Sequence, residues 1–93
     1  MKSIYTVGPV SVAAGESINL IPGTSDFLYI NTISYGGAVE LYVCYGSNEL
    51  LVDSDSTRGT WTSLVYYATY EHYYKVKNVS AGSIMISADG LVL

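Results

Sequence analysis

Apolar and polar residues alternate with a period of two through almost the whole 93-residue sequence, and this feature constrains the fold most strongly. In the segment 38–45 (AVELYVCY), Val39, Leu41 and Val43 fall on one face of a strand and the residues between them on the other. Side chains of a β-strand alternate between two faces, whereas those of a helix repeat every 3.6 residues. Turn residues such as Pro22-Gly23 separate the alternating segments. The pattern therefore predicts strands throughout.

The spacing of these segments indicates the architecture. Short strands that follow one another every ~8–12 residues, with turn residues between them, favour an all-β antiparallel fold. A chain of this length is too short to divide into several domains. We therefore expect residues 1–93 to form one domain, a single antiparallel β-sandwich or jelly-roll-like barrel of about eight short strands.

The end of the sequence, YYKVKNVSAGSIMISADGLVL, predicts three consecutive strands. The first two are predicted to pair across a turn at Ala81-Gly82, and Asp89-Gly90 predicts a tight turn before the third. The third strand would be Leu91-Val92-Leu93, which is apolar although chain ends are usually frayed and solvated. We expect these residues to be hydrogen-bonded into a sheet or onto a neighbouring chain.

Two segments near the ends of the chain repeat one pattern. Residues 12–18 (VAAGESI) and 79–84 (VSAGSI) both place Ala-Gly at a turn and Ser-Ile after it. The repeat is compatible with two related hairpins that meet in one sheet. The simpler interpretation is that two turns use the same residues independently.

The charge of the chain excludes some partners. Charged residues make up 13% of the sequence, against about 25% in a typical domain. The net charge is −4, and Lys75 and Lys77 form the one basic cluster, so we expect no nucleic-acid partner. No apolar run approaches the ~18 residues of a membrane span, so we expect no membrane partner. A small protein with so little charge is expected to use part of its surface as an interface.

Residues that could carry chemistry lack the neighbours that they would need. His72 has no nucleophile or orienting group in a recognisable motif. Cys44 lies among tyrosines rather than the cations that would activate a thiol, and whether it is free or bridged to another copy stays open. A short strand predicted at ELLV runs into a polar loop, 53–59 (DSDSTRG). This loop begins like a calcium loop but has Arg58 and Leu64 where glycine and glutamate are required. We therefore predict no enzyme activity and no catalytic, cofactor-binding or metal-binding residues.

Aromatic residues are concentrated between positions 61 and 74. With a period of two, Tyr66 and Tyr70 share one strand face and Tyr67 takes the other, so both faces carry rings. Tyrosine and tryptophan are enriched at protein interfaces, although they also form cores or stack on sugars. The candidate interface residues are Trp61, Tyr66, Tyr67, Tyr70, Tyr73, Tyr74, Leu91, Val92 and Leu93.

The segments VSVAAGESINL and YYKVKNVSAGSIMISADG resemble the turn motifs of small β-sandwich virion proteins, namely the capsid decoration (cement) and accessory proteins of tailed phages. This resemblance implies a non-enzymatic structural protein of the virion. Its partner would be the major capsid protein or another virion protein. The chain would stabilise that lattice through edge strands and aromatic surfaces, as a homo-oligomer, either a dimer or a trimer.

The aromatic residues also allow a different function. A carbohydrate-binding or receptor-binding module would stack sugars on Trp61 and the tyrosines, and would be located on an extracellular surface. A self-assembling filament or surface subunit is a third possibility.

Overall fold

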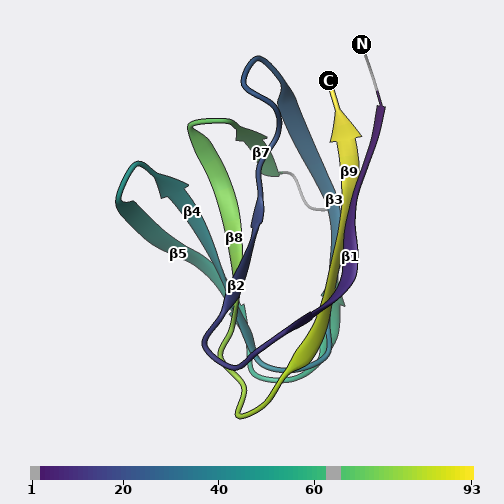
Figure 1. The fold of residues 1–93 in the computed structure, drawn as a ribbon, viewed down its shortest axis with the longest axis vertical. Helices are drawn as coiled ribbons and strands as arrows, with labels where there is room; N and C mark the ends of the chain where they lie inside the picture. The colour runs from purple at the N-terminus through teal and green to yellow at the C-terminus, as the bar shows by residue number, and fades with distance from the viewer. Residues whose placement is uncertain (1–2, 63–65) are drawn as a thin grey trace.

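The computed structural model describes residues 3–62 and 66–93, which form nine strands in two antiparallel sheets packed face to face (Figure 1). The spatial order in sheet A is β1 (Ser3–Val12), β9 (Ile84–Val92), β3 (Phe27–Tyr35) and β6 (Gly59–Trp61), and β7 (Tyr66–Thr69) also pairs with β3. The order in sheet B is β2 (Ser17–Leu20), β8 (His72–Asn78), β4 (Val39–Tyr45) and β5 (Asn48–Asp55). The predicted all-β sandwich is confirmed.

The core lies between the two sheets and is made by alternate residues of the strands. Val39 and Leu41 are fully buried, as the alternation of segment 38–45 predicted. Val43 faces the same way but is only half-buried, at the end of β4 where the two sheets diverge (Figure 1). The largest fully buried apolar side chains are Leu20, Leu28, Ile30, Ile33, Val39, Leu41, Val76 and Ile86. None of the described residues belongs to a helix that could cross a membrane.

The two repeated Ala-Gly segments are neither hairpins nor turns within one sheet. The turn after β1 leads from sheet A to sheet B, and the turn after β8 leads back from sheet B to sheet A. Because β1 pairs with β9 and β2 pairs with β8, the two crossings lie side by side. The predicted pairing of the strands on either side of Ala81-Gly82 is therefore wrong. These strands, β8 and β9, lie in different sheets.

Asn78 joins the two crossings. Its side chain is fully buried, and its Nδ2 donates hydrogen bonds to the carbonyl oxygens of Val12 at 2.9 Å and Gly82 at 2.8 Å. Its Oδ1 accepts from the backbone N–H of Ser80 at 2.8 Å. The backbone N–H of Gly15 donates to the Asn78 carbonyl at 2.9 Å. One buried amide thus satisfies backbone groups of both crossings.

The predicted tight turn at Asp89-Gly90 is absent, because β9 runs unbroken from Ile84 to Val92 between β1 and β3. A Cβ atom at Gly90 would collide with the carbonyl oxygen of Tyr29. Glycine at position 90 therefore allows β9 to lie very close to β3, beside a bulge in β3. It does not form a turn. The prediction that the last residues are hydrogen-bonded in a sheet is confirmed, since the Leu93 N–H donates to the Phe27 carbonyl at 2.8 Å.

Strand β5 extends further than the sequence predicted. The polar segment that begins at Asp53 was expected to be a loop, but β5 continues to Asp55. Asp55 is the register partner of Val39, and its carboxylate accepts a 2.6 Å hydrogen bond from the Tyr35 hydroxyl. The inward-facing carboxylate of Asp55 thus has a hydrogen-bond donor in the Tyr35 hydroxyl. The aromatic strand predicted after Trp61 includes residues 63–65, which lie outside the described residues.

Candidate interaction surfaces

The nine predicted interface residues do not form a single surface. The Trp61 ring centroid lies 4.6 Å from that of Tyr35, and the Tyr66 ring stacks on Tyr74 at 5.1 Å. These rings and Val92 pack against the core, and burial raises the pKa of the Tyr74 phenol. Trp61, Tyr66, Tyr74 and Val92 therefore contribute mainly to the packing between the sheets. The other five predicted residues lie on two separate surfaces.

The first surface is the outer face of sheet A, where the register places a row of apolar side chains across four strands. Ile4 of β1 is paired with Leu91 of β9, Leu91 with Tyr29 of β3, and Tyr29 with Tyr67 of β7. Phe27 and Leu93 lie on the same face one pair further along. We call this surface the outer patch; it consists of Ile4, Phe27, Tyr29, Tyr67, Leu91 and Leu93.

The outer patch is well exposed. The exposed fraction is 80% for Ile4 and 60% for Tyr67, and the Tyr29 and Tyr67 ring centroids are 5.4 Å apart. A pocket of about 540 Å³ opens between Ile4, Tyr29 and Leu91. Single exposed apolar residues are common, but a contiguous group of this kind marks an interaction site.

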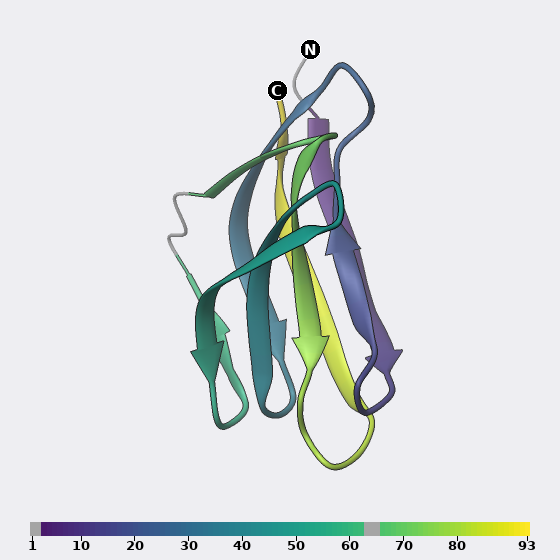
Figure 2. The same cartoon turned by 90° about the vertical axis from the view of Figure 1, so that its left-hand side faces the viewer.

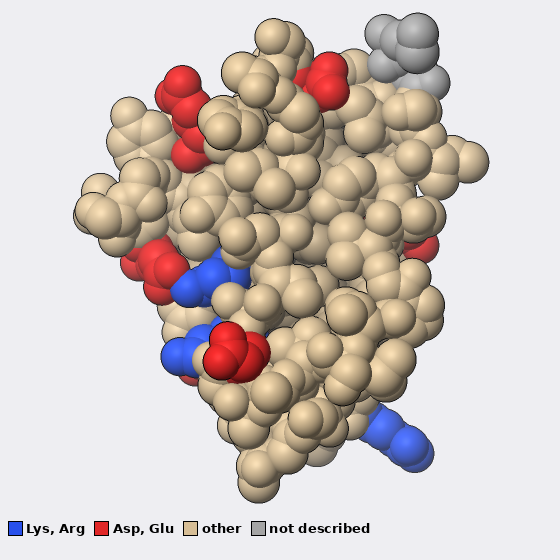
Figure 3. All heavy atoms as spheres, in the orientation of Figure 1, with Lys and Arg blue, Asp and Glu red and all other residues tan. Residues whose placement is uncertain are grey.

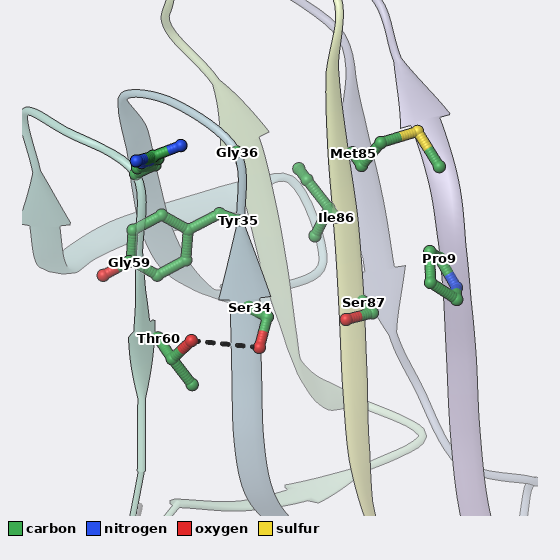
Figure 4. Close-up of a pocket in the computed structure, with 10 residues that line it drawn as sticks. Pro9, Ser34, Tyr35, Gly36, Gly59, Thr60, Met85, Ile86 and Ser87 are labelled. Carbon is green, nitrogen blue, oxygen red and sulfur yellow. Dashed lines mark hydrogen bonds between the residues drawn. The ribbon is translucent and has the colours of Figure 1, made fainter.

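The other half of the same face carries hydroxyl side chains beside Met85 (Figure 4). The Ser34 and Thr60 hydroxyl oxygens lie 3.2 Å apart, and Ser87 lies on the adjacent strand. With Arg58 and Met85, these residues line a pocket of about 490 Å³. Met85 is exposed on this half but stands among hydroxyl side chains, so the contiguous apolar row of sheet A lies in the half that contains the outer patch.

The second apolar surface is strand β5, which lies at the edge of sheet B. Leu50 is 64% exposed and Leu51 is 48% exposed, and Val52 is also exposed. We call these three residues the β5 edge. The alternation of residues predicted a strand here but not an exposed apolar surface. Three consecutive apolar residues in a strand cannot all face one core, and this was the available signal.

A third surface lies at the end of the sandwich where the β4–β5 and β7–β8 turns lie side by side (Figure 2). Three tyrosines and one acid line a pocket of about 490 Å³ there, together with Ile21 and Gly46. We call it the tyrosine pocket; its polar and aromatic residues are Tyr45, Tyr70, Glu71 and Tyr73. A neighbouring pocket of about 280 Å³ contains Asp26 as well as Glu71.

The outer face of sheet B carries a polar network. Lys75 forms an ion pair with Glu49, and its ammonium lies 5.2 Å from the centre of the Tyr42 ring. The Tyr42 hydroxyl donates to Glu40 at 2.6 Å. Figure 3 shows that the charged side chains on the face it presents gather mainly on the side of β4, β5 and β8, while the remainder is largely uncharged.

The residues considered for chemistry are placed as follows. Cys44 is a free cysteine that is almost fully buried, and burial raises the pKa of its thiol, which disfavours the reactive thiolate. His72 is exposed and its ring stacks on Tyr45 with centroids 4.3 Å apart. Asp53 and Asp55 lie in β5 rather than in a loop. Within residues 3–62 and 66–93, no group of three or more His, Cys, Asp or Glu side chains could hold a metal ion.

No protein-family model and no curated protein sequence matches the chain. A solved structure does match it, the Drosophila NLP core, with a TM-score of 0.58, 19% sequence identity and coverage of 98% of each chain. The crystal structure of that protein concerns pentamer formation and histone binding. The likeness establishes the fold.

The comparison contradicts the predicted virion protein. The matched NLP core, which is similar along nearly the whole chain, is an insect protein whose structure concerns pentamers and histone binding, not a phage decoration protein. The same comparison contradicts three related predictions: a capsid partner, a dimer or trimer, and a virion or extracellular location. The physical reason lies in the two quoted segments. They build the crossings around Asn78, and such turn residues follow from backbone geometry that many sandwiches share.

The predicted carbohydrate-binding or receptor-binding module is contradicted by the same comparison. The structure adds a local reason. Trp61 was expected to stack on sugars, but its ring packs on Tyr35.

Proposed function

We propose that this chain is a non-enzymatic subunit of a ring-shaped homo-oligomer, a pentamer like that of the NLP core, and that the ring binds basic proteins such as histones. The observation that carries the proposal is the presence of two separate apolar surfaces, the outer patch and the β5 edge. The fold likeness over 98% of both chains and the net charge of −4 support it.

The placement of the two surfaces suits a ring. A two-fold dimer needs one self-complementary surface, whereas a closed ring of five copies needs two different surfaces that meet head to tail. In Figure 1, sheet A with the outer patch lies on one side of the molecule and β5 lies on the other. In the proposed ring, the β5 edge of each subunit packs on the outer patch of the next one.

The chemistry of the two surfaces explains how copies with the same charge associate. The residues of the outer patch and the β5 edge are all uncharged. Their burial gains about 25 cal/mol per Å² of apolar area. Five chains of charge −4 give a ring with a formal charge of about −20. A field of that sign attracts basic proteins and speeds their association at low ionic strength.

Native mass spectrometry of the full chain tests the assembly. Five copies of the 10.0 kDa chain give a species of about 50 kDa. Leu91→Ser in the outer patch and Leu50→Ser in the β5 edge should each convert it to monomer without loss of folding. Met85→Ser is the matched control, because Met85 is 52% exposed but lies outside both surfaces. A wild-type monomer at all concentrations would overturn the proposed assembly.

Binding of purified core histones tests the partner class. We expect the assembled wild-type chain to retain histones at low salt, and to lose them as the salt concentration rises, because the attraction is electrostatic. A neutral or acidic protein of similar size should not be retained. Failure to bind histones at low salt would refute this part of the proposal.

A further inference from the structure

The tyrosine pocket has the composition of a site for an organic cation. Three of its lining side chains are tyrosines, and its one charged lining group is the carboxylate of Glu71. Neither this pocket nor the neighbouring one with Asp26 is lined by lysine or arginine. Within the described residues the single salt bridge joins Lys75 to Glu49, so Glu71 has no cationic partner there.

We infer that the tyrosine pocket binds the alkylammonium group of a lysine side chain, free or methylated, on a basic polypeptide. This inference rests on the proposed function in one respect, since it takes a basic protein as the partner. Tyrosine faces attract a cation through their negative ring potential, and cages of aromatic rings are a known solution for quaternary ammonium groups. The Glu71 carboxylate adds a charge-assisted contact and excludes anions.

The walls of the pocket are held in place by contacts within the chain. The Tyr45 ring stacks on His72 with centroids 4.3 Å apart and an angle of 13° between the planes. The turn that carries Tyr70 and Glu71 is closed by a 2.9 Å hydrogen bond from the His72 backbone N–H to the Thr69 hydroxyl. A preorganised pocket loses less entropy when it binds a ligand.

The volume and position of the pocket also suit this ligand. A volume of about 490 Å³ is within the usual range of small-molecule sites and holds a trimethylammonium group with its alkyl stem. In a ring with cyclic symmetry, the pockets of all subunits would lie at the same end of the ring. A polypeptide with several lysines could then engage more than one pocket, which raises its overall affinity without new contacts.

The first test uses small probes and does not require a basic protein. Choline and its uncharged isostere 3,3-dimethylbutan-1-ol are titrated into the wild-type chain, and the ring resonances of the tyrosines are followed by NMR. We expect choline to shift the resonances of Tyr45, Tyr70 and Tyr73, and the isostere to leave them unchanged. Equal binding of the two probes would show a merely apolar pocket and would overturn the inference.

The second test uses matched variants and a lysine peptide, in unmodified and trimethylated forms. Glu71→Gln should weaken binding of both peptide forms by about tenfold, whereas Glu16→Gln changes the net charge equally and should have no effect. Tyr70→Leu should weaken binding by about the same factor, and Tyr70→Phe should retain it because the ring remains. Stronger binding of the trimethylated form would assign the site to methylated lysine, and equal binding would assign it to lysine in general.

The failures of the two proposals are distinguishable. If choline and the peptides bind but histones do not, the cation site stands and the proposed partner is wrong. If histones bind and neither Glu71→Gln nor Tyr70→Leu weakens the binding of any probe, the partner stands and the cation site is wrong.

Discussion

Asn78 is the residue on which the two crossings between the sheets depend. Replacing it with alanine leaves the buried carbonyl oxygen of Val12 without the Asn78 donor and removes one of the two donors to the Gly82 carbonyl, the other being the Ser80 hydroxyl. We expect Asn78→Ala to lower the free energy of unfolding by about 2–4 kcal/mol, measured by urea denaturation. Asn19→Ala is the control, because Asn19 is exposed on β2, and it should change stability by less than about 0.5 kcal/mol. Similar losses for the two variants would contradict the role given to Asn78.

The Tyr35–Asp55 hydrogen bond makes stability depend on pH. The Tyr35 hydroxyl, with help from the Thr57 backbone, holds the pKa of Asp55 below its ordinary value of 3.8. A carboxylate with a lowered pKa stabilises the fold above about pH 4, and this contribution is lost as the pH falls further. The free energy of unfolding should therefore decrease on acidification below pH 4, and less steeply in Tyr35→Phe.

The alkaline side has the opposite sign. Burial, followed by the contact with Asp55, raises the pKa of Tyr35 above its ordinary 10.0. A group with a raised pKa contributes stability below about pH 10 that is lost as the pH rises. Tyr35→Phe has no phenol to ionise and should again show the weaker dependence. Identical pH profiles for the two chains would contradict the importance of this pair.

At the level of the strands, β9 depends on a residue without a side chain. A Cβ atom at Gly90 would meet the backbone of Tyr29, whereas one at Gly82 would meet open space. Gly90→Ala should separate β9 from β3 and reduce the free energy of unfolding by more than about 3 kcal/mol, or prevent folding. Gly82→Ala should fold normally, as judged by circular dichroism and thermal melting. A stable Gly90→Ala variant would show that β3 can shift to make room.

The alternation of apolar residues predicted the strands and their faces because period two is a local property. It placed Val39 and Leu41 in the core and anticipated the pairing of the last residues. It could not show that Gly90 serves a close approach between strands, because that requirement comes from a partner distant in sequence. For the same reason it could not assign β8 and β9 to different sheets.

At the level of the whole molecule, the sequence predicted an interface and grouped residues that lie on different faces of the fold. Tyr67, Leu91 and Leu93 were predicted to be interface residues and lie in the outer patch. Val92 was grouped with them but faces the core, since the two faces of one strand serve different purposes. The residues that complete the patch, such as Ile4 and Phe27, come from strands far apart in sequence, so only the register reveals them.

The opposite faces of β9 give a prediction that separates folding from assembly. Val92→Ser should lower the free energy of unfolding by about 1–3 kcal/mol, because it places an unsatisfied hydroxyl against the core. Leu91→Ser should leave the stability of the monomer nearly unchanged and weaken the assembly. Denaturation measured at a concentration where the chain is monomeric distinguishes these effects. An equal loss of monomer stability in both variants would contradict the assignment of Leu91 to an interface.

The central claim is that the outer patch of one copy meets the β5 edge of another, and native mass spectrometry of a mixture tests it most directly. Leu91→Ser has a damaged patch and an intact edge, whereas Leu50→Ser has the reverse. Each variant alone is predicted to be monomeric. An equimolar mixture is predicted to form a one-to-one heterodimer of about 20 kDa, twice the 10.0 kDa chain, because one functional pair of surfaces remains. A mixture that stays monomeric, or a single variant that still forms the full ring, would contradict the account.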